Sequence, residues 1–114
     1  MTLRYVLIGQ TPVPEPDLDK WAEWYESLQN RIVKQEYIGA VMVSTVFLGL
    51  NHRFGEGPPL LFETMAFSDG STIYELGITR CSTWLEAEAQ HRATCEKVRA
   101  QRRPAKSFRG ASPP

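Results

Sequence analysis

The amino-terminal third of the chain combines one β-prone run with one helical stripe. Residues 3–9, LRYVLIG, are rich in β-forming side chains and predict a first strand that ends near Gly9. Three prolines in residues 11–16, TPVPEP, then break regular strand pairing, because proline lacks the backbone N–H. Behind a candidate N-cap at Asp17, apolar side chains recur at helical spacing and predict an amphipathic helix of about three turns. The stripe consists of Leu18, Trp21, Tyr25 and Leu28, with Trp24 at its edge.

The middle of the chain reads as consecutive strands. Residues 31–50 predict two strands that turn near Gly39, and the second, VMVSTVFLGL, is apolar on both faces, as expected of a central strand. After the loop NHRFGEGPP, residues 51–59, the run LLFETMAF predicts another strand. A turn at SDGS, where Gly70 can take a positive φ, leads to a last predicted strand, TIYELGITRC. Short connections between these strands favour antiparallel pairing.

A final helix is announced by its first residues. Thr83 with Glu86 three positions later forms a capping box, and Ser82 is a second candidate cap. The positions that follow at spacings of three or four share one face, which should pack on the sheet and bring His91 with it. This face consists of Trp84, Ala87, His91, Thr94 or Cys95, and Val98.

The order of elements predicts an α+β fold. We expect a two-layer sandwich with a mainly antiparallel sheet of about four to five strands and two helices packed on one face. A chain of 114 residues is long enough for one core, so residues 1–101 should form a single domain. Residues 102–114 are predicted to be a flexible basic tail, because they are rich in Pro, Ser and Arg.

Composition narrows the class of protein. The hydrophobic fraction of 42% and charged fraction of 23% are typical of a soluble globular protein, and no apolar run is long enough to span a bilayer. The start, MTLRYVLIGQ, predicts a strand rather than a signal peptide. Cys81 and Cys95 match neither a disulfide scaffold nor a CxxC or zinc-knuckle spacing, so we expect reduced thiols in a bacterial-type cytosol.

Charge is unevenly distributed along the chain. Residues 1–95 hold seven basic and twelve acidic side chains, a net −5, whereas residues 96–114 hold six basic and one acidic, a net +5. Nucleic-acid binding through this basic end is one hypothesis, and it predicts an affinity that falls steeply with salt and disappears when residues 96–114 are deleted. A solvated terminus is the simpler interpretation.

Both histidines of the chain stand near an acidic strand residue in the predicted fold. His52 begins the glycine- and proline-rich loop, Glu63 lies on the strand after it, and His91 points inward from the last helix. If these three converge, they suffice for a zinc-type site or for a histidine general base oriented by a carboxylate. A structural network is the competing interpretation, in which Arg80 or loop N–H groups satisfy Glu63. We expect no metal and no cofactor, and the charge state of Glu63 remains open.

The loop motif itself excludes one function. FGEGPP lacks the GxxxxGK[ST] order and runs into a strand instead of a helix, so it does not predict a phosphate-binding loop. The side chains that we expect to contact a partner are Arg53, Phe54, Arg80 and Trp24.

Nearly the whole chain outside the tail resembles one family. VSTVFLGLNHRFGEGPPLLFETMAF, followed by RCSTWLEAEAQH, is similar to small proteins of tailed bacteriophages and prophages with a VSTVFLGLDH…GPPLLFETMVF core and an RYSTWxEAxxGH helix start. This family has no assigned reaction. Its motif corresponds here to His52, Glu63, Thr64, Arg80, Thr83 and His91. The chain departs from the pattern at Asn51, where Asp is more frequent, and at Gln90, where Gly is frequent.

The resemblance implies a phage-encoded protein that acts in the cytoplasm of the bacterial host. We expect a non-enzymatic accessory protein that binds a host or phage macromolecule, with interference in host defence as one version. A small hydrolase or a ligand- or metal-binding protein that uses His52, Glu63 and His91 is the alternative. The expected partner is a host or phage protein, a homodimer is a further option, and no membrane association is expected.

Overall fold

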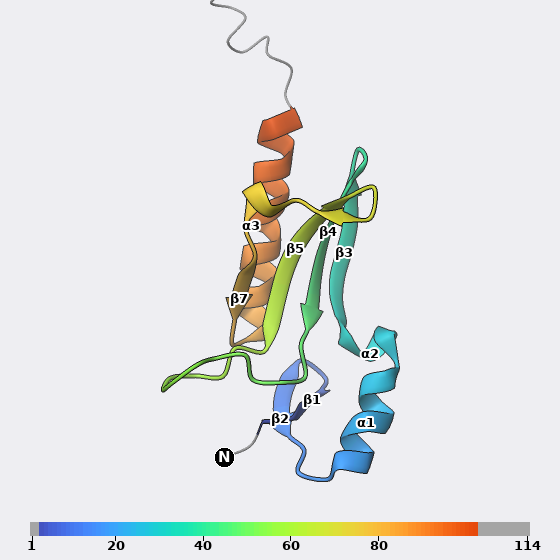
Figure 1. Cartoon of the computed structure of the whole chain (residues 1–114), viewed down its shortest axis with the longest axis vertical. Helices are drawn as coiled ribbons and strands as arrows, with labels where there is room; N and C mark the ends of the chain where they lie inside the picture. Colours follow the sequence, from blue (N-terminus) through green and yellow to red (C-terminus); the bar gives the residue numbers. More distant parts are fainter. Residues whose placement is uncertain (1–2, 103–114) are drawn as a thin grey trace, which may run out of the picture.

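The computed structural model describes residues 3–102 and has the predicted α+β fold (Figure 1). Of the predicted basic tail, residues 102–114, residue 102 still belongs to the last helix, and residues 103–114 lie outside the described residues. The elements in chain order are β1 (Tyr5–Ile8), β2 (Thr11–Pro14), α1 (Leu18–Glu26), α2 (Leu28–Arg31), β3 (Ile32–Ile38), β4 (Val41–Phe47), β5 (Phe62–Ser68), β6 (Ser71–Thr72), the 3-10 helix η1 (Tyr74–Leu76), β7 (Thr79–Cys81) and α3 (Trp84–Arg102).

The main sheet is antiparallel throughout its described strands. β4 lies between β3 and β5, as its apolar sequence predicts, and β6 and β7 pair with different parts of β5. The turn from β3 to β4 places Gly39 at φ 62°, in the left-handed region that glycine adopts without steric cost. Because side chains alternate along each strand, Val43, Thr45 and Phe47 of β4 share the face that carries Ala66, Thr64 and Phe62 of β5.

The first strand ends at Ile8, near Gly9 as predicted, but the prediction that the prolines after it break regular strand pairing is wrong. Residues Thr11–Pro14 form β2, which pairs with β1 in a separate two-stranded hairpin. Pro12 and Pro14 occupy alternate positions, opposite Leu7 and Tyr5. In an antiparallel pair every second residue points its N–H away from the partner, so both prolines sit where no donor is needed.

The predicted strand TIYELGITRC is also corrected. It is interrupted by η1, and only Ser71–Thr72 and Thr79–Cys81 pair with β5. The 3-10 turn lets Leu76 enter the core with 5% exposure, and Gly77 reverses the chain at φ 81°. Burial of Leu76 against the core therefore competes successfully with continued strand pairing.

Helix α3 covers one face of the sheet (Figure 1). Its capping box forms as predicted: the Thr83 N–H donates to Glu86 Oε1 at 3.1 Å, and the Glu86 N–H donates to Thr83 Oγ1 at 3.1 Å. The predicted inner face is buried from Ala87 to Val98 and packs over two apolar clusters. One cluster contains Val43, Ala66, Cys95 and Val98, and the other contains Phe47, Leu61, Phe62 and Ala87.

Helix α1 lies at the end of the sheet, beside the β1–β2 hairpin (Figure 1). It reaches the α3 side of the core through Trp24, whose ring packs edge-on against Phe47 at a centroid distance of 5.7 Å. Trp21 Nε1 donates to the carbonyl oxygens of Tyr5 and Gly49, which fastens α1 to the hairpin. The single helix of about three turns predicted here is corrected: α1 ends at Glu26, and Leu28 begins the separate short helix α2. Leu18 and Leu28, the two ends of the predicted apolar stripe, are about half exposed.

Candidate functional site

The loop 51–60 carries three of the sequence candidates and is held closed at its base. Asn51 Oδ1 accepts hydrogen bonds from the N–H groups of Arg53 at 2.9 Å and Leu60 at 3.0 Å. The side chain of Arg53 bonds across the loop to the Pro58 carbonyl. His52 is exposed, and its backbone N–H donates to the Leu60 carbonyl at 3.0 Å. Asn51 therefore organises the loop, a role that an aspartate at this position would perform with the same acceptor oxygen.

Glu63 serves the architecture of the sheet. It lies on the face opposite α3, and Arg80 of β7 is its direct register partner. Arg80 Nε donates to Glu63 Oε2 at 2.9 Å, with the glutamate side chain 14% exposed and the arginine side chain 40% exposed. The structure thus supplies the partner that the structural interpretation named for this carboxylate.

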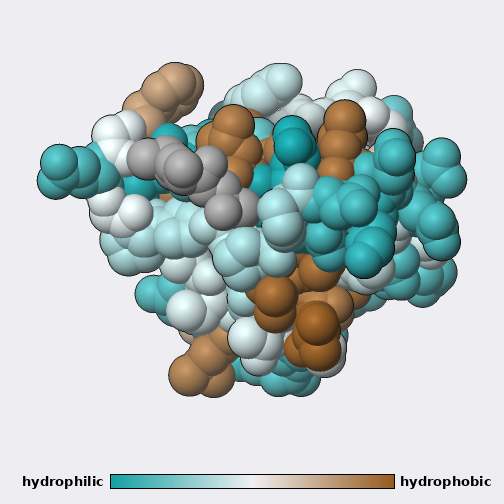
Figure 2. All heavy atoms as spheres, turned by 90° about the horizontal axis from the view of Figure 1, so that it is seen from below, coloured by the Kyte–Doolittle hydropathy of each residue, from teal (hydrophilic) through white to brown (hydrophobic). Residues whose placement is uncertain are grey.

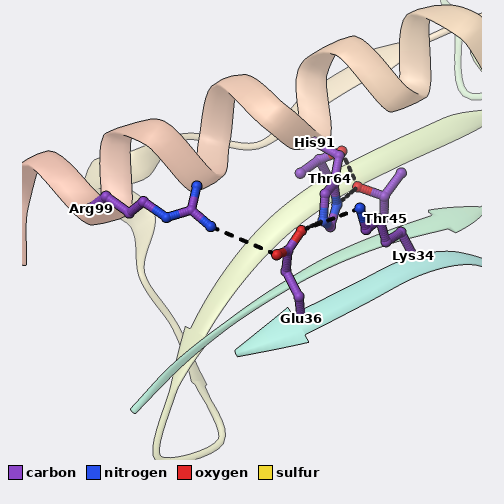
Figure 3. Close-up of polar contacts among 6 residues, drawn as sticks. All are labelled: Lys34, Glu36, Thr45, Thr64, His91 and Arg99. Carbon is purple, nitrogen blue, oxygen red and sulfur yellow. Dashed lines mark hydrogen bonds and ion pairs between the residues drawn. The ribbon is translucent and has the colours of Figure 1, made fainter. Parts of the chain in front are cut away.

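His91 projects from α3 onto the other face of the sheet, where its side chain is 1% exposed (Figure 3). Its Nδ1 is 2.7 Å from Thr45 Oγ1, and its Nε2 is 2.9 Å from Glu36 Oε1. Thr45 Oγ1 is in turn 2.6 Å from Thr64 Oγ1. Strands β3, β4 and β5 therefore each place one polar side chain in a line of contacts that passes through His91 of α3.

One arrangement of hydrogens satisfies every member of this line. Gln90 Nε2 donates to Thr64 Oγ1 at 3.0 Å. The Thr64 hydroxyl then donates to Thr45, the Thr45 hydroxyl donates to His91 Nδ1, and the protonated Nε2 donates to the Glu36 carboxylate. We call this line, from Gln90 to Glu36, the buried polar chain. Each hydroxyl in it gives one hydrogen bond and accepts one, so both threonine hydroxyls and both imidazole nitrogens of this line have partners.

The expected His52, Glu63 and His91 site does not assemble. Adjacent residues of a strand point to opposite faces, and Thr64 belongs to the buried polar chain, so Glu63 is separated from His91 by the sheet. His52 is in the exposed loop. The partner of His91 is instead Glu36, which the sequence does not single out, because it stands in a run of three consecutive polar residues, Lys34, Gln35 and Glu36.

The environment sets the charges around His91. Burial lowers the pKa of His91 below its ordinary value of 6.5, and the neighbouring Glu36 carboxylate opposes this effect. Hydrogen bonds from His91 and Cys95 hold the pKa of Glu36 below its ordinary value of 4.5. Burial raises the pKa of the Cys95 thiol to about 11, with Glu36 adding to the effect. At neutral pH the imidazole and thiol are therefore neutral, and the carboxylate is charged.

This geometry resembles a hydroxyl, imidazole and carboxylate triad but cannot act as one. Thr45 is completely buried, and the adjoining Thr64 is 1% exposed, so no substrate carbonyl can reach either hydroxyl. The contacts satisfy the buried polar groups and fix the helix on the sheet.

The two remaining candidates, Phe54 and Trp24, differ in exposure. Phe54 is 99% exposed at the tip of loop 51–60, whereas Trp24 is partly buried in the core. A groove of about 680 Å³ lies between the loop and the hairpin. Its walls include Tyr5, Pro14, Arg53, Glu56 and Pro59.

Both cysteines are free thiols, and burial raises the pKa of Cys81 as well, to about 11. Within residues 3–102 no helix is long and apolar enough to cross a membrane. Comparison of the chain with family models, with curated proteins and with solved structures gives no match.

Proposed function

We propose that this chain is a phage-encoded accessory protein that binds a host or phage protein through loop 51–60. The single observation that carries this proposal is Phe54, which is 99% exposed on a loop whose base is closed by hydrogen bonds. The phage origin rests on the resemblance of the sequence core and the helix start.

The construction of the loop supports a role in recognition. It projects from the body of the molecule (Figure 1). Gly55 and Gly57 adopt φ values of 82° and 125°, which residues with a side chain rarely take, and Arg53 packs against Gly57. A braced loop loses little conformational entropy when it binds, and aromatic anchors supply much of the energy of protein interfaces.

Charge favours a protein partner over a nucleic acid at this loop. Arg53 is its only basic residue, its Nε is engaged with Pro58, and Glu56 balances its charge. Phosphate binding requires several free cations, which the loop lacks. An apolar pocket on a protein is the complementary surface for a projecting phenyl ring.

Other exposed apolar side chains near this end do not form a single surface. Figure 2 shows the molecule from below, with apolar residues in separate groups among polar ones. The large exposed apolar residues of the adjacent segments are Leu3, Ile8, Leu18 and Leu50. Isolated apolar residues of this kind are normal on protein surfaces, so Phe54 remains the best-defined anchor.

Affinity capture from host lysate with matched variants tests the proposal. Phe54→Ala should abolish retention of a specific protein, and binding of that purified protein should weaken at least tenfold. Tyr74→Ala is the control, because Tyr74 is 73% exposed on η1, which lies toward the opposite end of the sheet from the loop (Figure 1). Tyr37→Ala probes the sheet face opposite α3, where Tyr37 is 73% exposed. Loss with Tyr37→Ala but not with Phe54→Ala, or no specific capture by the unmodified chain, would contradict the assignment.

A further inference from the structure

Three potential metal ligands meet at the end of the buried polar chain. Glu36, His91 and Cys95 each offer one ligand atom, and these atoms all lie within 4.8 Å of one another. His91 and Cys95 are four residues apart on α3, so both project from one helical face toward the same strand. Glu36 of β3 faces His91 (Figure 3), and its carboxylate is also close to the Cys95 thiol.

We propose that Glu36, His91 and Cys95 form a binding site for a zinc-class divalent ion, with a fourth position open to water or to a ligand. This inference is independent of the proposed protein-binding loop.

The donor set matches the chemistry of zinc. Imidazole nitrogen, thiolate sulfur and carboxylate oxygen are the three ligand types that Zn²⁺ takes in proteins. Ligand atoms at tetrahedral zinc lie roughly 3.3–3.7 Å apart, given bond lengths of about 2.0–2.3 Å. The Nε2 to Oε1 distance of 2.9 Å needs to open slightly, and distances as large as 4.8 Å need to close by about 1 Å. The proposed site therefore requires small rotations of the Glu36 and Cys95 side chains when the ion binds.

The surroundings of His91 suit a metal ligand. Its Nδ1 is held by Thr45 at 2.7 Å, which fixes the ring and directs Nε2 toward the other two donors. When Nε2 binds an ion, the proton moves to Nδ1 and the Thr45 hydroxyl accepts it as a hydrogen bond, then donates to Thr64. The Thr45 hydroxyl can therefore change from donor to acceptor toward His91 without moving, and Thr64 Oγ1 then accepts hydrogen bonds from both Thr45 and Gln90.

An ion can approach from the solvent side. Glu36 has a 31% exposed side chain, whereas His91 and Cys95 are almost fully buried. A pocket of about 150 Å³ reaches one of the three ligands, His91, and its other walls are Val33, Lys34, Glu88 and Arg92. Lys34 and Arg99 lie 3.7 and 3.8 Å from the Glu36 oxygens, beyond close hydrogen-bond distance, and both are more than half exposed. Two anionic ligands, the carboxylate and the thiolate, balance the charge of the ion once the thiol proton has been released.

Cobalt(II) spectroscopy on the full chain tests this site, because a thiolate bound to Co²⁺ absorbs in the near ultraviolet and four-coordinate Co²⁺ gives strong visible bands. One equivalent should produce both features, and Zn²⁺ should bleach them. The chain has two cysteines, so Cys81→Ala should retain the thiolate band and Cys95→Ser should lose it. Glu36→Gln should weaken Co²⁺ binding at least tenfold, and circular dichroism checks that each variant is folded.

Several results would overturn the proposal. They are an absence of Co²⁺ binding at micromolar concentrations, Co²⁺ binding without a thiolate band, and a band that depends on Cys81 but not on Cys95. Should Cys95→Ser fail to fold, Glu36→Gln decides, because Glu36 is partly exposed and its replacement keeps the shape of the side chain. Unchanged affinity in a folded Glu36→Gln variant would remove the carboxylate from the site.

Discussion

At the scale of single residues, the core of this protein is unusual because it contains fully buried polar side chains. Thr45, Thr64 and His91 are each at most 1% exposed, yet they lie in the middle of the core that joins α3 to the sheet. Hydroxyl groups so deeply buried are tolerated only when they are paired. The hydrogen bonds of the buried polar chain therefore favour one position of α3 along the sheet, in which both hydroxyls and the imidazole are paired.

The threonine pair should show strong coupling. Thr45→Val keeps the shape of the side chain but leaves His91 Nδ1 without its donor, so it should cost about 1–3 kcal/mol of unfolding free energy. Thr64→Val should also destabilise the protein, because Gln90 and Thr45 both contact Thr64. Urea denaturation of the single and double variants should give a double-variant loss smaller than the sum, by at least about 0.5 kcal/mol. Strict additivity would show that the two hydroxyls act separately.

Stability should fall on acidification through His91. Its folded pKa is lowered, so below about pH 6.5 the unfolded chain takes up a proton that the folded chain excludes. The unfolding free energy should then decline by at most about 1.4 kcal/mol per pH unit, and protonation of Glu36 should add to the loss below about pH 4.5. Urea titrations from about pH 8 to about pH 5 measure this slope. His91→Gln should flatten this slope, and an unchanged slope in that folded variant would refute the assignment.

At the scale of elements, the start of α3 depends on one hydroxyl. Thr83 Oγ1 accepts from the Glu86 N–H, whereas the Ser82 side chain makes no such contact and only its backbone N–H reaches Glu86. Thr83→Ala should therefore cost about 1 kcal/mol, and Ser82→Ala should change stability by less than about 0.5 kcal/mol. Thermal or urea unfolding followed by helical circular dichroism distinguishes the two. A larger loss with Ser82→Ala would reassign the cap.

Loop 51–60 should respond to the chemistry of residue 51. Asn51→Ala removes the acceptor of two backbone N–H groups, so the base of the loop should open and trypsin should cleave faster after Arg53. Asn51→Asp keeps the acceptor and should protect the loop as well as the native side chain does. Limited proteolysis at matched enzyme ratios measures both rates. If the aspartate variant is cleaved as fast as the alanine variant, the hydrogen bonds do not hold the loop.

The sequence identifies the elements better than the contacts between them. The capping box, the Gly39 turn and the central position of β4 follow from local rules, because each depends on neighbours in the chain. The β2 strand was missed because proline is compatible with alternate positions of a hairpin, which only pairing reveals. The partner of His91 depends on the register between β3 and β4, and that register includes an irregularity between Ile32 and Lys34. The spacing of His91 and Cys95 places both on one helical face, but only the folded chain shows that this face meets Glu36.

At the scale of the whole molecule, the sheet divides the described chain into two environments. The α3 side holds the core and the buried polar chain, and the opposite side holds the Glu63 and Arg80 pair with Tyr37 exposed. Loop 51–60 projects from the end where the hairpin and α1 also lie (Figure 1). The proposed binding loop and the proposed metal site therefore belong to separate parts of the fold, and a variant in one should leave the other intact.

The alternation of side chains along β4 and β5 has a practical consequence. The side of the sheet without α3 carries four half-buried apolar residues of these strands, Met42, Val46, Met65 and Phe67. Their side chains point away from the buried polar chain, which lies on the other face. A library that randomises these outward positions should keep a large share of folded members, since the helix and its contacts remain untouched. The same chain could thus be given new specificities by protein engineering while its interior is left as it is.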